Sequence, residues 1–161
     1  MDASFDFEAL KWLRETWTGK LIVKGIARPE DAKRCAEIGI DGAMLSNHGG
    51  RQIDSALPAL ATLETCLAAT DMPLFVDGAM TRGSHIAKAL CAGARMVGLG
   101  RVLLYGLAAA GEAGVKHCLS ILMEELDREQ AMLGAPKLSD LSADLLHPRG
   151  GIDEGVSKRS A

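Results

Sequence analysis

The segment "SNHGGR", at positions 46–51, brings a hydroxyl (Ser46), an imidazole (His48) and a guanidinium (Arg51) close together in the chain. An imidazole can act as an acid or a base near neutral pH, and a guanidinium pairs readily with an anionic group. Each side chain taken alone is also common in ordinary loops, the histidine solvated and the arginine in a surface ion pair. Their meaning therefore depends on the structural elements that position them.

Polar or glycine-rich groups follow other apolar segments of the chain as well. Lys24 and Asp77 each end one such segment, and the run "GLGR" ends a third. Lys24 fits either a desolvated lysine in a site or one that reaches the surface, and Asp77 fits either a ligand-binding residue or one that bonds backbone amides. The apolar segments are continuous rather than alternating, which is typical of strands covered on both faces. They lie at 21–25, 42–47, 73–78 and 95–101.

Helical patterns separate and follow these predicted strands. The segment 28–39 ends at Gly39, where a C-terminal glycine belongs. The segment 84–93 repeats this plan, with Ser84 as its predicted N-cap. Further helices are predicted at 7–17, 111–135 and 141–147.

Strands that alternate with helices predict parallel pairing through right-handed crossovers. A doubly wound open sheet and a (β/α) barrel both fit this alternation. We favour the barrel because every predicted strand ends in a polar or glycine-rich cluster, whereas an open sheet concentrates its chemistry at one switch point. A whole barrel needs eight such units in about 250 residues, and 161 residues leave room for four. The sequence thus predicts an α/β fold of four parallel strands with helices, half of a TIM (β/α)8 barrel.

The composition excludes several classes of protein. A net charge of −3, an aromatic content of 4% and the lack of a basic stripe argue against a nucleic-acid partner. The N-terminus is acidic where a secretory signal is basic, and the apolar runs are shorter than a membrane span, so we expect a cytoplasmic protein. The four cysteines lie 25 to 31 residues apart, which predicts reduced, packed thiols and no metal site.

Four phrases of the sequence carry a resemblance to a known enzyme family. They are "LIVKGI", "DGAMLSNHGGRQID", "LFVDGAMTRGSHIAKALCAGA" and "VGLGRVLLYGLAAAGEAGV", in this order and spacing. Together they resemble the FMN-dependent α-hydroxy-acid dehydrogenases and oxidases. The (S)-mandelate dehydrogenase branch is the most similar, with L-lactate dehydrogenases and glycolate oxidases close behind. The resemblance covers about residues 2–146 and matches only the C-terminal half of the family barrel, strands five to eight.

The resemblance implies roles for four residues in oxidation of a hydroxy acid. His48 matches the active-site base, which takes a proton and touches the substrate. Arg51 matches the arginine that holds the substrate carboxylate, a task that suits a planar, two-pronged donor. Lys24 matches the lysine beside the N1/O2 edge of the flavin, and Ser46 matches a flavin-contacting serine.

Two loops match those that bind the phosphate and ribityl chain of FMN in the family. The first loop departs from the family pattern, because Thr81 stands where a phosphate-binding arginine is typical. Arg82 is the neighbouring candidate to replace that arginine. The predicted cofactor-binding residues in the two loops are Asp77, Gly78, Ala79, Met80, Thr81, Gly100 and Arg101.

The implied function is FMN-dependent oxidation of a mandelate-like or lactate-like (S)-2-hydroxy acid to the 2-keto acid. The candidate electron acceptors are oxygen, a quinone and a cytochrome. Because the first four strands of the family barrel are not matched, we expect a homo-oligomer or association with a separate N-terminal half. Peripheral attachment to the inner membrane is a further property of the mandelate branch.

Two other interpretations stay open at the level of the sequence. Lys24 could be the Schiff-base nucleophile of a barrel aldolase, although this leaves the "HGGR" run and both phosphate loops without a role. The chain could also be a truncated, catalytically incomplete half-barrel that serves as a structural or phosphate-binding module. In either case we predict one domain over 1–146 and a mobile tail over 147–161.

Overall fold

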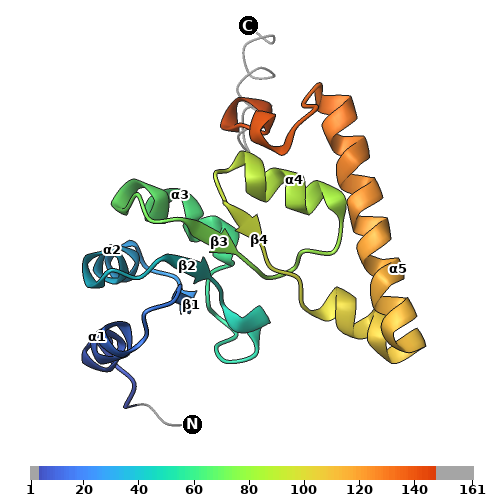
Figure 1. Cartoon of the computed structure of the whole chain (residues 1–161). Coiled ribbons are helices and arrows are strands. Elements are labelled where there is room, and N and C mark those ends of the chain that lie inside the picture. The colour runs from blue at the N-terminus through green and yellow to red at the C-terminus, as the bar shows by residue number, and fades with distance from the viewer. Residues whose placement is uncertain (1–3, 148–161) are drawn as a thin grey trace, which may run out of the picture.

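Four short strands form one parallel sheet in the computed structural model, which describes residues 4–147 (Figure 1). Their spatial order follows the chain, β1-β2-β3-β4, and all three pairings are parallel. The predicted set of four parallel strands is therefore confirmed. The strands are β1 (Ile22–Ile26), β2 (Gly42–Leu45), β3 (Leu74–Val76) and β4 (Met96–Val97).

Five helices accompany the sheet, and α2 and α3 cover the strands that they connect. The predicted end of α2 is confirmed, because Gly39 caps it in the left-handed conformation, with φ of 87°. Helix α3 had no sequence prediction: its sequence is apolar almost throughout, and Pro58 before it provides no side-chain cap. The helices are α1 (Phe7–Thr16), α2 (Pro29–Ile38), α3 (Ala59–Ala69), α4 (Gly83–Cys91) and α5 (Arg101–Leu133).

The predicted N-cap of α4 is wrong. Ser84 lies inside the helix, and Arg82 occupies the N-cap position without a side-chain cap. The carboxylate of Glu125, from α5, replaces the missing cap by accepting a hydrogen bond from the Gly83 amide at 2.7 Å. A tertiary contact thus satisfies an amide that a local side chain normally binds.

The C-terminal part of the chain differs from the prediction in two respects. Helix α5 begins at Arg101, ten residues before the predicted start, and its backbone is non-helical at Ala110 and Gly111. The short helix predicted at 141–147 is present as a single 3₁₀ turn, Ala143–Leu145, and a second 3₁₀ turn that was not predicted, Leu138–Asp140, precedes it. The predicted tail at 147–161, apart from its first residue, lies outside the described residues.

The core lies between the sheet and the helices α2 and α3. Its most deeply buried large side chains include Leu45, Leu74 and Val76 from the strands and Leu63 from α3. All four cysteines are free, as predicted. Burial raises the pKa of the Cys35, Cys66 and Cys91 thiols, which keeps them protonated and unreactive.

Two carboxylates, those of Asp41 and Glu125, form hydrogen bonds between separate segments of the chain and make the stability of the fold depend on pH in acid. The hydrogen bond from the Gly83 amide is the main cause that lowers the pKa of Glu125, and the hydrogen bond from Lys20 is the main cause that lowers the pKa of Asp41. Each group stabilises the fold above its ordinary pKa, 4.5 for Glu125 and 3.8 for Asp41. This stability is lost as pH falls through the lower pKa of the folded state.

We therefore expect the urea midpoint of unfolding to fall steeply below pH 4.5. Glu125→Gln should lower the midpoint at neutral pH and flatten its decline in acid, because the substituted amide no longer titrates. Urea unfolding of both proteins, followed by circular dichroism across this pH range, measures the difference. If the urea midpoints of the two proteins fell in parallel as the pH was lowered, Glu125 would not be a source of the acid sensitivity.

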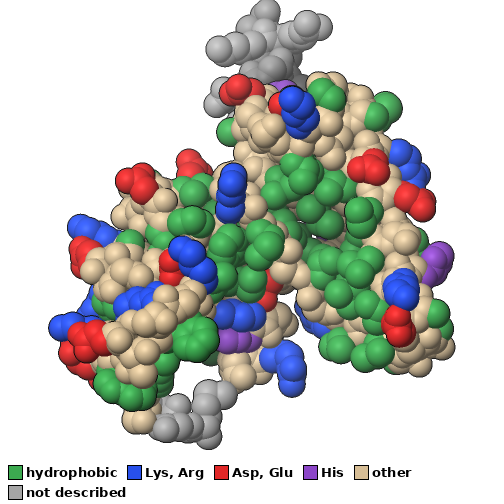
Figure 2. All heavy atoms as spheres, in the orientation of Figure 1, with side chains coloured by type: hydrophobic (Ala, Val, Ile, Leu, Met, Phe, Trp, Pro, Cys, Tyr) green, Lys and Arg blue, Asp and Glu red, His purple; other side chains and the backbone are tan. Residues whose placement is uncertain are grey.

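Both edges of the sheet are open within residues 4–147. Strands β1 and β4 each have one neighbour, and the side chains of Ile22 and Met96 on these edges are 48% and 49% exposed. Figure 2 shows hydrophobic side chains gathered across the middle of the molecule, over β3, β4, α4 and the beginning of α5. None of the helices in this part of the chain combines the length and apolar character that a membrane crossing requires.

Candidate active site

Three neighbouring strands bring Lys24, Ser46 and Asp77 together. Ser46 and Asp77 directly follow β2 and β3, whereas Lys24 lies inside β1, which continues to Ile26 rather than ending at the lysine as its apolar segment predicted. Parallel pairing places all carboxyl ends at one edge of the sheet. The Lys24 ammonium donates hydrogen bonds to the Ser46 hydroxyl at 2.6 Å and to the Asp77 carboxylate at 2.5 Å.

Ser46 lies beneath this cluster rather than at its surface. The residue is 2% exposed, and its hydroxyl also accepts a hydrogen bond from the His48 amide at 3.1 Å. It therefore fixes both the ammonium of Lys24 and the start of the loop that carries His48.

The loop after β2 holds His48 in an unusual conformation. His48 itself has φ of 54°, and Gly49 and Gly50 follow with φ of 70° and 75°. The Asn47 side chain supports this turn by accepting a hydrogen bond from the Gly49 amide at 3.0 Å. The imidazole packs over Gly25, where a Cβ would lie 2.9 Å from Nε2. A glycine at position 25 is what makes room for the ring.

A cavity of about 700 Å³ opens beside these groups, in the size range of small-molecule and cofactor sites. It is lined by every predicted site residue except Ser46: Lys24, His48, Arg51, Asp77, Gly78, Ala79, Met80, Thr81, Gly100 and Arg101. A second hollow of about 390 Å³ shares Asp77 to Met80 and Arg101 with it. The geometry thus brings the candidates from all four strand ends into one place.

The cavity is positively charged. Among the described residues that line it, Lys24, Arg51 and Arg101 are cations, and Asp77 is the one carboxylate. Asp77 is already paired with Lys24, which leaves the two arginines unbalanced by any acid in the lining. The lining favours an anionic ligand.

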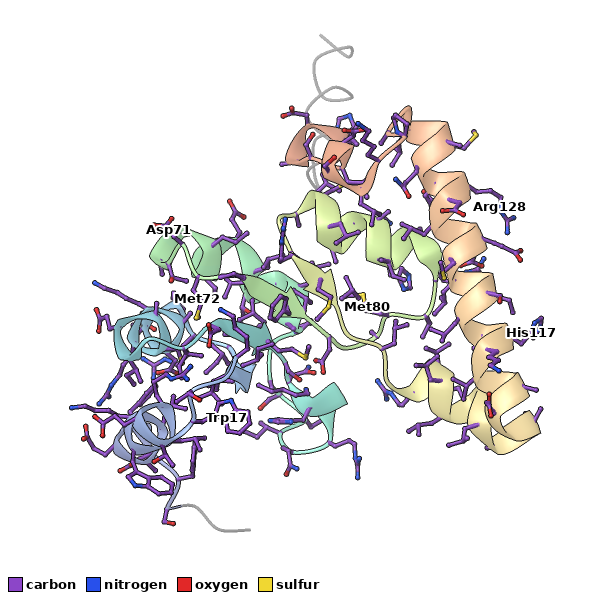
Figure 3. All side chains as sticks on the ribbon, in the orientation of Figure 1. Trp17, Asp71, Met72, Met80, His117 and Arg128 are labelled. Carbon is purple, nitrogen blue, oxygen red and sulfur yellow. The ribbon has the colours of Figure 1, made fainter. Side chains whose placement is uncertain are left out.

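The loop after β3 and the start of α5 form one end of the cavity. Gly78 and Ala79 have φ of 95° and 55°, and Gly100 is the N-cap of α5, with open space where a Cβ would be. Free amides at a helix N-terminus together with Arg101 suit a phosphate group. Met80 differs from its neighbours, because it is 7% exposed and its side chain lies in the core beside β4 and α4 (Figure 3).

Some cavity residues have no place in the sequence prediction. Tyr105 stands one turn after Arg101 in α5, and His85 is on the first turn of α4, which follows the loop that contains Thr81. A helix brings residues four apart onto one face, so the spacing of Arg101 and Tyr105 was the signal that could have found Tyr105. The others are Gly49, Gln52, Gly98, Val102 and Leu104.

Among the described residues, no group of three or more histidine, cysteine, aspartate and glutamate side chains could hold a metal ion.

Comparison with known proteins places this chain beside flavoenzymes. Residues 1–148 match a family model described as FMN-dependent dehydrogenase. An (S)-mandelate dehydrogenase of Pseudomonas putida is 50% identical over 150 residues, which cover 93% of this chain and 38% of that protein. An L-lactate dehydrogenase of Pseudomonas paraeruginosa is 38% identical over 147 residues, 90% of this chain and 39% of that protein.

The solved structures agree with the sequence matches. A crystal structure described as the monotopic membrane protein (S)-mandelate dehydrogenase superimposes with a TM-score of 0.90 at 50% identity, covering 92% of this chain and 40% of that one. This chain therefore spans about two-fifths of the length of these relatives. The four parallel strands form half of a TIM barrel, as the sequence predicted.

Proposed function

This chain belongs to the FMN-dependent dehydrogenase family, and we propose that it supplies the catalytic rim for oxidation of a mandelate-like or lactate-like (S)-2-hydroxy acid to the 2-keto acid. The observation that carries the proposal is the single cavity lined by Lys24, His48 and Arg51. These three side chains offer a fixed cation, an acid–base group and a carboxylate partner within one site.

The residues at the cavity fit FMN. Asp77 Oδ1 is buried and has no hydrogen-bond partner among the described residues, so it can accept a hydrogen bond from a hydroxyl of the ribityl chain. The amides near Gly100 and the guanidinium of Arg101 suit the phosphate. Lys24 would lie at the ring system. When bound, FMN supplies the two-electron acceptor that hydroxy-acid oxidation requires.

His48 and Arg51 would act on the substrate. We assign to His48 Nε2 or Nδ1 the proton that leaves the hydroxyl or the α-carbon, because the ring is exposed at the cavity and packs over Gly25, while the Ser46 hydroxyl holds the His48 backbone amide. We assign the substrate carboxylate to Arg51, which is exposed at the cavity. Oxidation of the alcohol carbon would release two electrons and two protons, and bound FMN would supply the acceptor for the electrons.

The aldolase interpretation is less well supported than the flavin one. A Schiff-base lysine must present a free amine to the substrate. The Lys24 ammonium instead donates hydrogen bonds to the Asp77 carboxylate and the Ser46 hydroxyl, so it is already engaged by two neighbouring groups.

A chimeric enzyme tests the proposed activity. The 150 aligned residues of this chain would replace the corresponding 38% of the Pseudomonas putida (S)-mandelate dehydrogenase. We expect the chimera to retain FMN and to oxidise (S)-mandelate or (S)-lactate with an artificial electron acceptor. A folded, flavin-containing chimera without activity on either acid would refute the proposed function.

We further propose that the isolated chain associates through its open sheet edges. When no separate N-terminal half is present, its partner is a second copy of the same chain. Exposed edges and apolar surface promote such pairing, and Leu104 and Tyr105 add side chains that are 59% and 68% exposed. We expect dimers or larger species in sedimentation velocity at micromolar concentrations. Ile22→Lys, on the edge strand β1, should shift the distribution towards monomer. A wild-type chain that stays monomeric would contradict this proposal.

The location of the chain in the cell is also a proposal. We propose a cytoplasmic protein that can attach peripherally to a membrane, because the mandelate dehydrogenase neighbour is described as a monotopic membrane protein. Fractionation of cells that express the full-length protein, with and without a high-salt wash of the membranes, distinguishes the two states.

A further inference from the structure

His85 stands at the phosphate end of the cavity, and the proposed hydroxy-acid chemistry gives it no role. It is half-buried on the first turn of α4 and lines both the large cavity and the neighbouring hollow. Its Nδ1 lies 3.2 Å from the carbonyl oxygen of Ala79 and 3.4 Å from the amide nitrogen of Thr81. The ring therefore contacts the backbone of the loop that follows β3.

One ring nitrogen cannot serve both of these backbone groups at the same time. Nδ1 accepts a hydrogen bond from the Thr81 amide only when it carries no hydrogen, and it donates to the Ala79 carbonyl only when it carries one. A protonated imidazole carries hydrogen on both nitrogens, so it donates to Ala79 and releases the Thr81 amide. Protonation of His85 thus adds a positive charge to the loop and frees a backbone donor.

The other cation of this loop is already engaged. Arg82, the sequence candidate to replace a phosphate-binding arginine, pairs with Glu125 at 2.8 Å and 3.1 Å through two of its nitrogens. Thr81 itself is neutral. His85 is therefore the side chain next to the loop that can gain positive charge without breaking an ion pair.

We propose that His85 binds the phosphate group of FMN in its protonated form and couples cofactor binding to uptake of a proton. This inference rests on the proposed function, which places the phosphate at the loop after β3 and the start of α5. A phosphate dianion favours the state in which the imidazolium and the released Thr81 amide both face it as donors.

Some of the charged groups around His85 oppose its protonation and others favour it. Arg82 and Lys88 on α4 and Arg101 at the start of α5 oppose its protonation, as do Lys24, His48 and Arg51 when charged across the cavity. Asp77, after β3, favours it, although this carboxylate is paired with Lys24.

Fluorescence titration of the flavin-free chimera with the Pseudomonas putida enzyme tests the proposal, with FMN and with riboflavin as the ligands. Riboflavin lacks the phosphate, so its affinity reports the ring and ribityl contacts alone. Measurements at about pH 6.5, 7.5 and 8.5 lie above the second pKa of a phosphate monoester, about 6. We expect FMN affinity to fall with rising pH, by up to about tenfold per pH unit for one proton, while riboflavin affinity stays constant.

His85→Asn and His85→Gln should abolish this pH dependence and weaken FMN binding about tenfold at pH 6.5, because a charge-assisted hydrogen bond is lost. The matched control is His117→Asn, since His117 is exposed on the outer side of α5 (Figure 3). Flavin binding with a pH dependence that survives both His85 variants would overturn the role of His85 and leave the proposed function intact. Binding of neither FMN nor riboflavin would overturn both.

Discussion

His48→Asn, made in the chimera with the Pseudomonas putida enzyme, is expected to lower kcat by about 10²- to 10⁴-fold, the usual contribution of a positioned acid–base group. Asparagine is a suitable replacement because it tolerates the left-handed backbone that His48 adopts, with φ of 54°. The loop and the cavity should therefore keep their shape while the titratable group is lost. Steady-state kinetics and the flavin absorbance of the purified variant provide the two measurements.

Arg51→Met is the comparison that separates proton transfer from substrate binding. We expect it mainly to raise KM for the hydroxy acid, because a carboxylate contact acts in the ground state as well as in the transition state. His48→Asn should leave KM much less affected than kcat. If both variants changed KM alone, His48 would be a binding residue and the proposed acid–base role would be wrong.

The candidate site could be predicted from sequence because its residues lie late in a continuous apolar segment or directly after one. Lys24, Ser46 and Asp77 each come at the end of a continuous apolar segment, and parallel pairing then brings them within hydrogen-bond distance. The orientation of Ser46 could not be predicted in this way. Its burial beneath Lys24 depends on the register between β1 and β2, which includes an irregularity between Lys24 and Ile26.

Contacts between distant segments explain most of the remaining differences. Nothing near Ser84 in the sequence indicates that Glu125, some forty residues later, caps α4. The same contact occupies Arg82, which the local sequence offers as a phosphate ligand. A local pattern predicts an element well, but it cannot show which of its polar groups another element has already bound.

The start of α5 shows how such a contact shapes the site. Residues 101–109 begin at the cavity and residues 112–133 form the long part of α5 that packs against α4, with the non-helical backbone of Ala110 and Gly111 between them (Figure 1). The two segments approach at Gly106 and Gly114, which are both buried. A Cβ on Gly114 would overlap the carbonyl oxygen of Gly106. This close approach fixes the direction of the first segment, and with it Arg101 and Tyr105.

Gly114→Ala is therefore expected to destabilise the fold by about 3 kcal/mol, a cost at the upper end of overpacking substitutions. The direction of the stability change is informative, because helix propensity alone predicts that a helix with alanine at this position is more stable than one with glycine by about 1 kcal/mol. Thermal unfolding should show a decrease in Tm of about 6–12 °C for a chain of this size. Ser120→Ala, at an exposed position of the same helix, is the control and should change Tm little. An increase in Tm for Gly114→Ala would mean that the two segments of α5 do not cross at this pair of glycines, and the position of Arg101 at the cavity would then lack its structural support.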